Sequence, residues 1–369
     1  MHDLEGHLKK LQTPYFSFDL AQINANYHEF LSLFPGVKVF YAMKSNSQLE
    51  VLKSLHDEGC GFEIASTGEL AKLLDIGVSP AKIIYSNPVK SSSSIELAFE
   101  KGIKKFSFDS LQEVHKLAKH APGCEVFLRI AVSEYGSRFS MSEKFGVLPT
   151  EAVSLAKQAV EHGLKLVGVA FHVGSQAENL AQWRTAIDEV RSVIEELHEL
   201  GIRLDFLDIG GGYPELYNMT EVPSLGEIAS EALSAVRDLP YKLDLYVEPG
   251  RRLVANAATL TVSVIARLER KEENWLFLDA GAYSGVFEAM VFQGNMRFDI
   301  EPPPNRNGQN TLFVLTGPTC DSLDTISYSA ELPDDIQEGD RLVIKNVGAY
   351  SLCFATEFNG FEIPKAYFD

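Results

Sequence analysis

The sequence lacks the features that would tie it to nucleic acid or to a membrane. Its 33 basic residues are outnumbered by 51 acidic ones, giving a formal net charge of −18. Binding to nucleic acid or anionic lipid needs clustered Lys and Arg, so we expect neither partner. No run approaches the roughly 20 apolar residues of a membrane-spanning helix, and residues 1–19 lack the apolar segment of a secretory signal. These absences favour a cytoplasmic protein.

Cysteine is scarce as well. The four cysteines, at positions 60, 124, 320 and 353, form no CxxC pair and no cysteine–histidine spacing typical of zinc sites. We therefore predict free thiols in a reducing compartment, with no metal centre and no disulfide framework. The chain also has no repeat of fixed period and no low-complexity tract, which argues against solenoid and linker-rich architectures.

Between residues 20 and 258 the chain alternates short apolar runs with amphipathic stretches, the pattern of parallel strands joined by crossover helices. Segments such as 69–76, 150–162 and 180–200 place apolar residues three and four apart, which is typical of helices. Eight such units predict an α/β fold, a (β/α)8 TIM-like barrel. The eight runs expected to be strands are 37–42, 62–65, 82–86, 105–108, 125–130, 166–172, 206–209 and 243–247.

After residue 258 the pattern changes to strand-like runs separated by polar, proline or glycine turns. The runs AATLTVSVIARL, NWLFLDAG, TLFVLTG and DRLVIKNVG predict a C-terminal all-β domain over residues 259–369. The early run 15–18 precedes the first barrel helix and is expected to pair with that sheet. Residues 1–19 are therefore assigned to the β domain and residues 20–258 to the barrel.

Lys44 directly follows the first predicted strand, in the motif FYAMKSN. In a barrel of this kind the active site lies at the carboxyl ends of the strands. A lysine there can form a Schiff base with an aldehyde cofactor when its surroundings lower its pKa. Taken alone, a lysine at a strand end is more often simply solvated, so the neighbouring motifs decide the interpretation.

Three other strand ends carry groups suited to a phosphorylated ring. In DIGGGYP, Gly210–Gly212 expose consecutive backbone N–H groups that could cradle a phosphate. In EPGRRLV, Glu248 could hold a protonated pyridine nitrogen and Arg251 a phosphate. In FHVGSQ, His172 could stack on a flat ring and Ser175 could contact a phosphate oxygen, although a lone histidine is about as often a structural hydrogen-bonding group.

Together with GPTCDSLD, GAYS and FNGF in the predicted β domain, these motifs resemble the ornithine, lysine and diaminopimelate decarboxylases, a pyridoxal-phosphate family of the alanine-racemase-like class. The resemblance extends from about residue 14 to 361. GPTCDS and FNGF are similar to the ornithine/lysine branch, because the diaminopimelate branch typically has Cys-Glu where this chain has Cys320-Asp321. The resemblance implies pyridoxal 5′-phosphate as cofactor and decarboxylation of ornithine or lysine to the diamine and CO2.

The resemblance also assigns roles to residues. It implies Lys44 as the Schiff-base lysine, Glu248 beside the pyridine nitrogen and His172 stacked on the ring, all three catalytic. Glu63 stands where many eukaryotic relatives have Asp. The residues expected around the cofactor are Lys44, Glu63, Arg129, His172, Ser175, Gly210, Gly211, Gly212, Glu248, Gly250, Arg251 and Tyr350.

At the substrate, the resemblance implies Cys320 as the proton donor to Cα and Asp321 as the partner of the distal ammonium. Family members are homodimers in which this segment completes the site of the other subunit. Phe358, Glu288 and Gln293 are further candidates for substrate binding. Many ornithine decarboxylases carry an aspartate where this chain has Gln293, and the uncharged amide leaves ornithine, lysine and a modified amino acid all open as substrates.

Three alternatives therefore stand beside a diamine-forming decarboxylase. The first is a decarboxylase of a larger or modified amino acid, such as a diaminopimelate-like compound. The second is a noncatalytic relative, which the presence of Lys44, Glu248, Arg251 and Cys320 argues against. The third is a small cofactor-carrier protein of the same barrel type, which the strand-rich residues 259–369 argue against. The sequence does not reveal the pathway, any regulator or an oligomeric state beyond a dimer.

Overall fold

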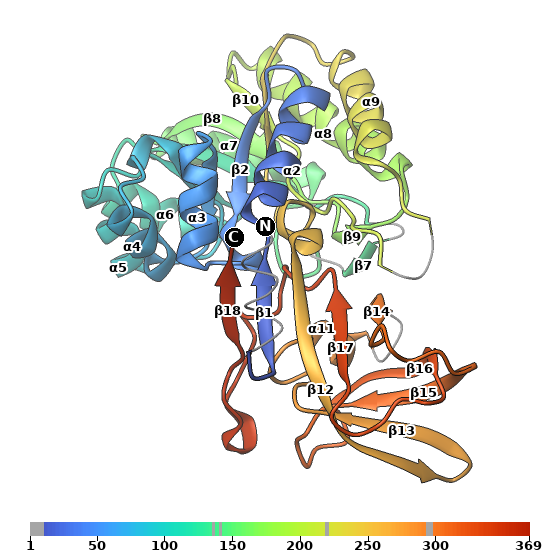
Figure 1. Ribbon diagram of the computed structural model, residues 1–369. Coiled ribbons are helices and arrows are strands. Elements are labelled where there is room, and N and C mark those ends of the chain that lie inside the picture. The colour runs from blue at the N-terminus through green and yellow to red at the C-terminus, as the bar shows by residue number, and fades with distance from the viewer. Residues whose placement is uncertain (1–10, 135–136, 140–141, 218–220, 293–297) are drawn as a thin grey trace. The chain divides into compact units, whose positions relative to one another are not determined.

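The computed structural model describes residues 11–134, 137–139, 142–217, 221–292 and 298–369 (Figure 1). The described residues fall into two compact units. One comprises residues of Asn24–Pro214 and Val222–Arg252 and is called the barrel unit below. The other comprises residues of Met1–Ile23, Glu215–Glu221 and Leu253–Asp369 and is called the sheet unit. In the described part of the chain, no helix is both long and apolar enough to cross a membrane.

The barrel unit contains a closed barrel of eight strands in the order β10-β11-β2-β3-β4-β5-β6-β8, which confirms the predicted fold class. Neighbouring strands pair in parallel. The strands agree with the eight predicted runs to within one or two residues at each end. They are β2 (Lys38–Ala42), β3 (Gly61–Ile64), β4 (Ile83–Tyr85), β5 (Lys105–Phe108), β6 (Glu125–Arg129), β8 (Lys165–Ala170), β10 (Phe206–Asp208) and β11 (Asp244–Val247).

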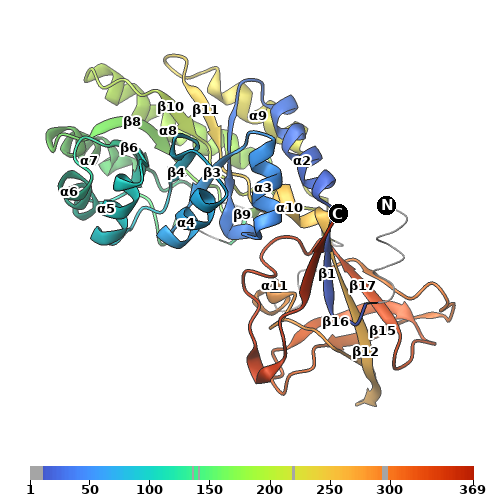
Figure 2. The same cartoon turned by 60° about the vertical axis from the view of Figure 1, so that its left-hand side comes forward.

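Helices follow the strands and surround the barrel (Figure 2). Helix α8 shows why they form, because its buried Trp183, Ile187, Val190 and Ile194 recur every three or four positions and share one face. The helices are α2 (Leu20–Leu33), α3 (Leu49–Asp57), α4 (Thr67–Asp75), α5 (Ser92–Glu100), α6 (Leu111–His120), α7 (Pro149–Glu161), α8 (Ala181–Glu199), α9 (Leu225–Val236) and α10 (Arg251–Val254). A further helix, α11 (Phe287–Val291), belongs to the sheet unit. Short 3-10 turns are η1 (Met43–Ser45), η2 (Pro80–Lys82), η3 (Ala255–Ala257) and η4 (Phe358–Gly360). Two further short strands, β7 (Ser137–Phe139) and β9 (Ser175–Ala177), pair with each other.

Aromatic side chains fill the interior of the barrel near the amino ends of its strands. The rings of Phe206 and Tyr246 are stacked with centroids 4.1 Å apart, and the Phe40 ring lies 4.9 Å from Tyr246. Gly168 makes room for this layer, since a Cβ there would come within 2.6 Å of the Phe206 ring. The packed layer closes one end of the barrel and leaves the carboxyl ends of the strands for polar side chains.

The sheet unit is built on an eight-stranded, mainly antiparallel sheet, as predicted for the C-terminal region. β1 pairs with β12, which confirms the expected pairing of run 15–18, and β1 also pairs in parallel with β18 at the end of the chain (Figure 1). β14, β16 and β18 were not among the predicted strands. The strands are β1 (Tyr15–Phe18), β12 (Ala258–Arg270), β13 (Glu273–Leu278), β14 (Ile300–Glu301), β15 (Asn310–Thr316), β16 (Thr325–Pro333), β17 (Arg341–Lys345) and β18 (Lys365–Phe368).

Candidate active site

Polar side chains gather at the carboxyl ends of the barrel strands. Because the strands are parallel and the barrel is closed, these ends share one face. Apart from Lys44, each of these residues is less than a tenth exposed, although polar groups are usually found at the surface. They are Lys44 after β2, Glu63 in β3, Ser86 after β4, Arg129 in β6, His172 after β8, Asp208 in β10 and Glu248 after β11.

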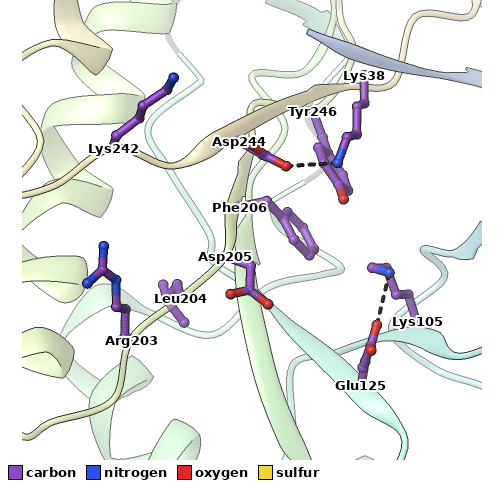
Figure 3. A pocket seen from close by; sticks show the side chains of 10 residues that line it. All are labelled: Lys38, Lys105, Glu125, Arg203, Leu204, Asp205, Phe206, Lys242, Asp244 and Tyr246. Atoms are coloured by element: carbon purple, nitrogen blue, oxygen red, sulfur yellow. Dashed lines mark hydrogen bonds and ion pairs between the residues drawn. The ribbon is translucent and has the colours of Figure 1, made fainter. Parts of the chain in front are cut away.

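The opposite end of the barrel carries a cavity of about 470 Å³ (Figure 3). Its charged side chains largely neutralise one another. The Lys38 ammonium lies 2.8 Å from Asp244 and the Lys105 ammonium 2.9 Å from Glu125. None of the described residues that line this cavity belongs to the predicted site. The amino ends of barrel strands usually serve stability rather than catalysis, so the carboxyl ends are the better candidate.

Lys44 lies in the 3-10 turn η1, between the buried residues Met43 and Ser45. This turn packs against the segment that follows β11. The Ala42 N–H donates a 3.0 Å hydrogen bond to the Pro249 carbonyl. A Cβ at Gly250 would lie 3.2 Å from the Ser45 side chain. The fold therefore brings Lys44 beside the Glu248–Gly250 segment, although about 200 residues separate them in sequence.

The three consecutive glycines after β10 pack tightly against the segment after β8. Gly210 and Gly212 have φ angles of +67° and +95°, in the region that favours glycine. A Cβ at Gly210 would overlap the Phe171 carbonyl oxygen, and one at Gly212 would overlap the Gly174 carbonyl oxygen. At Gly211 a Cβ would lie 2.6 Å from the Glu248 carbonyl oxygen. No side chain fits here. The Gly210 N–H is already bonded to Asp208 Oδ1, so the amides of Gly211 and Gly212 are the ones suited to a phosphate group.

His172 is held as a neutral imidazole by this packing. Its Nδ1 accepts a 2.9 Å hydrogen bond from the Gly174 N–H, so the proton of the neutral ring resides on Nε2. Burial lowers the pKa of His172 well below 6.5, and the nearby charges of Arg129 and Lys44 lower it further. A neutral ring keeps its face available for stacking on a planar group.

Arg251 and Ser175 form a second potential anion-binding site, next to the glycine turn. The Arg251 side chain, only 4% exposed, donates a 3.4 Å hydrogen bond to the Ser175 hydroxyl. A guanidinium beside a hydroxyl and a glycine-rich turn is a donor set suited to phosphate. These residues, with the glycines described above, fit the phosphate group of the cofactor expected from the sequence.

Three carboxyl groups lie within the buried ring, those of Glu63, Asp208 and Glu248. The Ser86 hydroxyl donates a short hydrogen bond to Glu248 Oε1, and the Glu248 N–H donates a 2.8 Å hydrogen bond to the Gly210 carbonyl. Burial raises the pKa of Glu63 to about 8, although the Lys44 charge opposes the rise. Burial also raises the pKa of Asp208 well above its usual value. This arrangement could bind a protonated ring nitrogen.

Sequence reasoning missed two members of this ring, Ser86 and Asp208. Both occupy predicted strand ends, at residues 82–86 and 206–209, and Asp208 opens the DIGGGYP motif. Their position was therefore a usable signal. What the sequence did not reveal was their contacts with residues of distant strands, such as Ser86 with Glu248.

In the sheet unit, Cys320 and Asp321 lie on the loop between β15 and β16. The Cys320 side chain is exposed, and its backbone N–H donates a 3.0 Å hydrogen bond to the Asn359 side chain. The Asp321 carboxylate accepts hydrogen bonds from the Tyr283 hydroxyl at 2.7 Å and from the Leu323 N–H at 2.9 Å. The Tyr283 ring in turn stacks on the Phe358 ring, 4.6 Å between centroids. Two predicted substrate-binding residues, Asp321 and Phe358, are thus brought together through Tyr283.

A buried aspartate that was not among the predicted residues, Asp324, organises this loop. Its carboxylate is inaccessible to solvent and accepts hydrogen bonds from the Ala282 N–H at 2.7 Å and the Thr319 N–H at 3.1 Å. A Cβ at Gly281 or Gly317 would overlap the Asp324 carboxylate. The two glycines and the acid therefore form one packed unit that fixes the Cys320–Asp321 segment.

Two further predicted residues belong to the same unit. Glu288 is buried in α11. Tyr350 adopts a positive φ of 54°, and its ring centroid lies 6.2 Å from that of Phe354. Gln293 lies outside the described residues. The roles assigned to these residues, and to those of the barrel, stay predictions.

Comparisons with known proteins agree with this chemistry. Residues 20–255 match the family described as pyridoxal-dependent decarboxylase, pyridoxal binding domain. The lysine/ornithine decarboxylase of Selenomonas ruminantium is 32% identical, over 96% of this chain and 88% of that protein. Antizyme inhibitor 2 of Xenopus laevis is 33% identical, over 94% and 79%. The structure of the lysine/ornithine decarboxylase of Vibrio vulnificus with cadaverine has a TM-score of 0.91 and 31% identity, covering 100% of this chain and 98% of that one.

Proposed function

Because the chain belongs to the pyridoxal-dependent decarboxylase family, we propose that it converts L-ornithine or L-lysine to the corresponding diamine and CO2. It is an amino-acid decarboxylase whose cofactor is pyridoxal 5′-phosphate. When bound, the cofactor accepts the electron pair left on Cα by the departing carboxylate. The observation that carries the proposal is the ring of buried polar groups at the carboxyl ends of the barrel strands.

In this proposal the barrel residues bind and orient the cofactor. Lys44 supplies the amine for its covalent attachment, and Glu248, held by Ser86, faces the ring nitrogen and keeps it protonated. Neutral His172 stacks on the ring, with Glu63 and Arg129 beside it. The residues proposed to hold the phosphate are Ser175, Gly210, Gly211, Gly212, Gly250, Arg251 and Tyr350; the close packing of the three consecutive glycines and the contact between Arg251 and Ser175 support this assignment.

The sheet unit supplies the groups that act on the substrate. Asp321 receives the distal ammonium, and Cys320 protonates Cα after CO2 has left. The fixed orientation of the Asp321 carboxylate, with donors at 2.7 and 2.9 Å, supports its assignment. Phe358 packs on the same tyrosine, Tyr283. Glu288 and Gln293 complete the proposed substrate-binding set and allow ornithine, lysine or a modified amino acid.

We further propose a homodimer in which the Cys320–Asp321 segment of each subunit completes the site of the other. Residues 20–258 would then form the cofactor-binding domain. Residues 1–19 and 259–369 would form the β domain, which contributes residues to the active sites shared between the two subunits. The four cysteines are free in the structure, which is consistent with a reducing cytoplasm. Diamine formation places the enzyme at an early step of polyamine biosynthesis.

The deciding experiment combines cofactor trapping with CO2 release. Purified protein with pyridoxal phosphate is expected to show a visible absorbance band that borohydride removes, with peptide mapping locating the cofactor on Lys44. Carboxyl-labelled ornithine, lysine, arginine and diaminopimelate are then compared for CO2 release. Lys44→Met should abolish both signals, whereas Lys53→Met, an exposed lysine of α3, should change neither.

Each outcome has a distinct meaning. Cofactor attachment with release from ornithine or lysine supports the proposal. Attachment with release only from arginine, diaminopimelate or another amino acid favours the modified-substrate alternative. A protein that takes up no cofactor would be a noncatalytic relative, an outcome made relevant by the similarity to a protein named as an inhibitor.

A further inference from the structure

The Asp208 carboxyl group has an unusual environment for an acid. It ends β10, it is inaccessible to solvent, and its Oδ1 accepts a 2.8 Å hydrogen bond from the Gly210 N–H. Among the described residues, no N–H or hydroxyl donor lies within reach of its buried Oδ2. An ionised carboxylate with an unsatisfied oxygen in a dry environment is strongly disfavoured, so the charged form of Asp208 does not fit this site.

An acidic neighbour of Asp208 is Glu248, which directly follows β11, the strand that pairs with β10. β10 and β11 pair with Asp208 opposite Tyr246, and the Gly210 carbonyl accepts the Glu248 N–H at 2.8 Å. The Glu248 carboxylate is close enough to Asp208 to raise the pKa of its carboxyl group, in addition to the larger effect of burial. Two ionised carboxylates have only acceptors and repel each other, so a direct contact between these two groups requires a proton on one of them.

We propose that Asp208 is a neutral carboxylic acid that donates its proton to the Glu248 carboxylate and so fixes the orientation of Glu248 toward the cofactor ring. Asp208 is then a positioning residue, since it acts through Glu248. The inference rests on the proposed role of Glu248 at the ring nitrogen.

The neighbouring charges agree with this assignment of the proton. Burial is the largest influence that raises the pKa of Asp208, and the Glu248 charge raises it further, while the Gly210 N–H and the Arg129 charge oppose the rise less strongly. Glu248 receives a separate hydrogen bond from the Ser86 hydroxyl. With Asp208 as a neutral donor, the Glu248 carboxylate has a donor on each side, Ser86 and Asp208, and its orientation is fixed.

Two substitutions separate a neutral donor from a charged group. In Asp208→Asn the amide oxygen can still accept the Gly210 N–H, and the amide nitrogen can still donate to Glu248. In Asp208→Ala both contacts are lost. We expect the pyridoxal phosphate dissociation constant of Asp208→Asn to stay within about threefold of the unchanged protein, and that of Asp208→Ala to rise about tenfold or more, as for loss of a hydrogen bond to a charged group.

The protonation state can be measured directly on the protein without cofactor. The infrared difference spectrum between the unchanged protein and Asp208→Asn should contain the carbonyl band of a protonated carboxylic acid, shifted in D2O. A difference spectrum with only carboxylate bands would overturn the proposal. So would an Asp208→Asn variant that fails to fold, or that loses the cofactor as severely as Asp208→Ala, because a neutral donor of equal shape should replace a neutral acid.

Failure of this inference is distinguishable from failure of the proposed function. If the unchanged protein takes up no pyridoxal phosphate, the proposed function is wrong. The infrared band then still reports whether Asp208 is protonated, but Glu248 would have no ring nitrogen to face, and the positioning role would be overturned with the function. If the unchanged protein binds the cofactor and the acid band is missing, the inference alone is wrong.

Discussion

The Tyr283 hydroxyl donates a 2.7 Å hydrogen bond to the Asp321 carboxylate. The pKa of Asp321 is lowered mainly by the hydrogen bond from the Leu323 N–H and, to a smaller extent, by this bond from Tyr283. The same bond raises the pKa of Tyr283. The acid proposed to receive the distal ammonium is therefore kept ionised and oriented by two donors before any substrate arrives.

Replacing Tyr283 by Phe removes one of these donors and keeps the ring that stacks on Phe358. We expect the KM for the diamine precursor to rise about two- to tenfold, as for loss of one hydrogen bond, with a smaller change in kcat. Steady-state CO2 release measures both constants. Tyr328→Phe is the matched control, because Tyr328 is 59% exposed. An unchanged KM in Tyr283→Phe would show that this hydroxyl does not orient the substrate-binding acid.

Asp324→Ala should loosen the loop that carries Cys320 and Asp321. The substitution leaves the Ala282 and Thr319 N–H groups without their carboxylate acceptor. Because a buried donor left unsatisfied costs about 1–3 kcal/mol, the free energy of unfolding should fall by about 2 kcal/mol or more in urea. Asp299→Ala is the control, since Asp299 is half exposed and makes only a surface ion pair with Lys345. Equal effects of the two substitutions would contradict the structural role of Asp324.

Lys90 makes a buried ion pair whose loss should destabilise the barrel unit. Its ammonium lies 2.9 Å from Glu113 and donates to the Asn87 and Ser107 carbonyls at 2.9 and 2.6 Å. The Lys90 and Glu113 side chains are 0% and 1% exposed. Lys90→Met removes the buried partner of Glu113 and the donor to two carbonyls, but leaves Glu113 its second, partly exposed partner Lys116 at 2.5 Å. The substitution should therefore lower the free energy of unfolding by about 2 kcal/mol or more.

Two comparisons test that explanation. Lys105→Met breaks a partly exposed pair with Glu125 and should lower the free energy of unfolding by less than about 1 kcal/mol. The double variant Lys90→Met with Glu113→Met removes both buried charges and should recover much of the lost stability, as measured by urea unfolding. No recovery in the double variant would mean that the carbonyl contacts of Lys90, rather than its charge pairing, hold the segment after β4.

Glu63 should make the stability of the cofactor-free protein fall as pH rises. Its pKa is about 8 in the folded protein and near 4.5 in the unfolded chain, so between these values the folded state binds the extra proton. The stabilisation is present below pH 4.5 and is lost as pH rises through 8. Urea unfolding at pH 5, 6, 7 and 8 should show a weaker decline in Glu63→Gln. If the free energy of unfolding falls with pH equally in both proteins, the group responsible is not Glu63 but another one, for example Asp208.

Much of the fold follows from local sequence patterns. The eight runs between residues 37 and 247 are apolar and short enough to be buried strands, and the stretches between them have helical periodicity. The parallel pairing of β1 with β18 was not predictable in this way, because it joins residues 15–18 to residues 365–368. Strand β16 also escaped prediction, since its exposed Tyr328 and Glu331 interrupt the apolar pattern.

The sequence by itself determined which residues end the barrel strands, and a closed parallel barrel places all those ends on one face. That is why Lys44, His172 and Glu248 could be selected from their positions at strand ends together with the motifs around them. Only the tertiary structure decided which of these groups touch. The contact between Ser86 and Glu248 joins β4 to β11, which are not neighbours in the barrel, and the proton proposed for Asp208 depends on burial that no local pattern encodes. Periodicity is a property of adjacent residues, whereas side-chain contacts and desolvation arise only when the barrel closes.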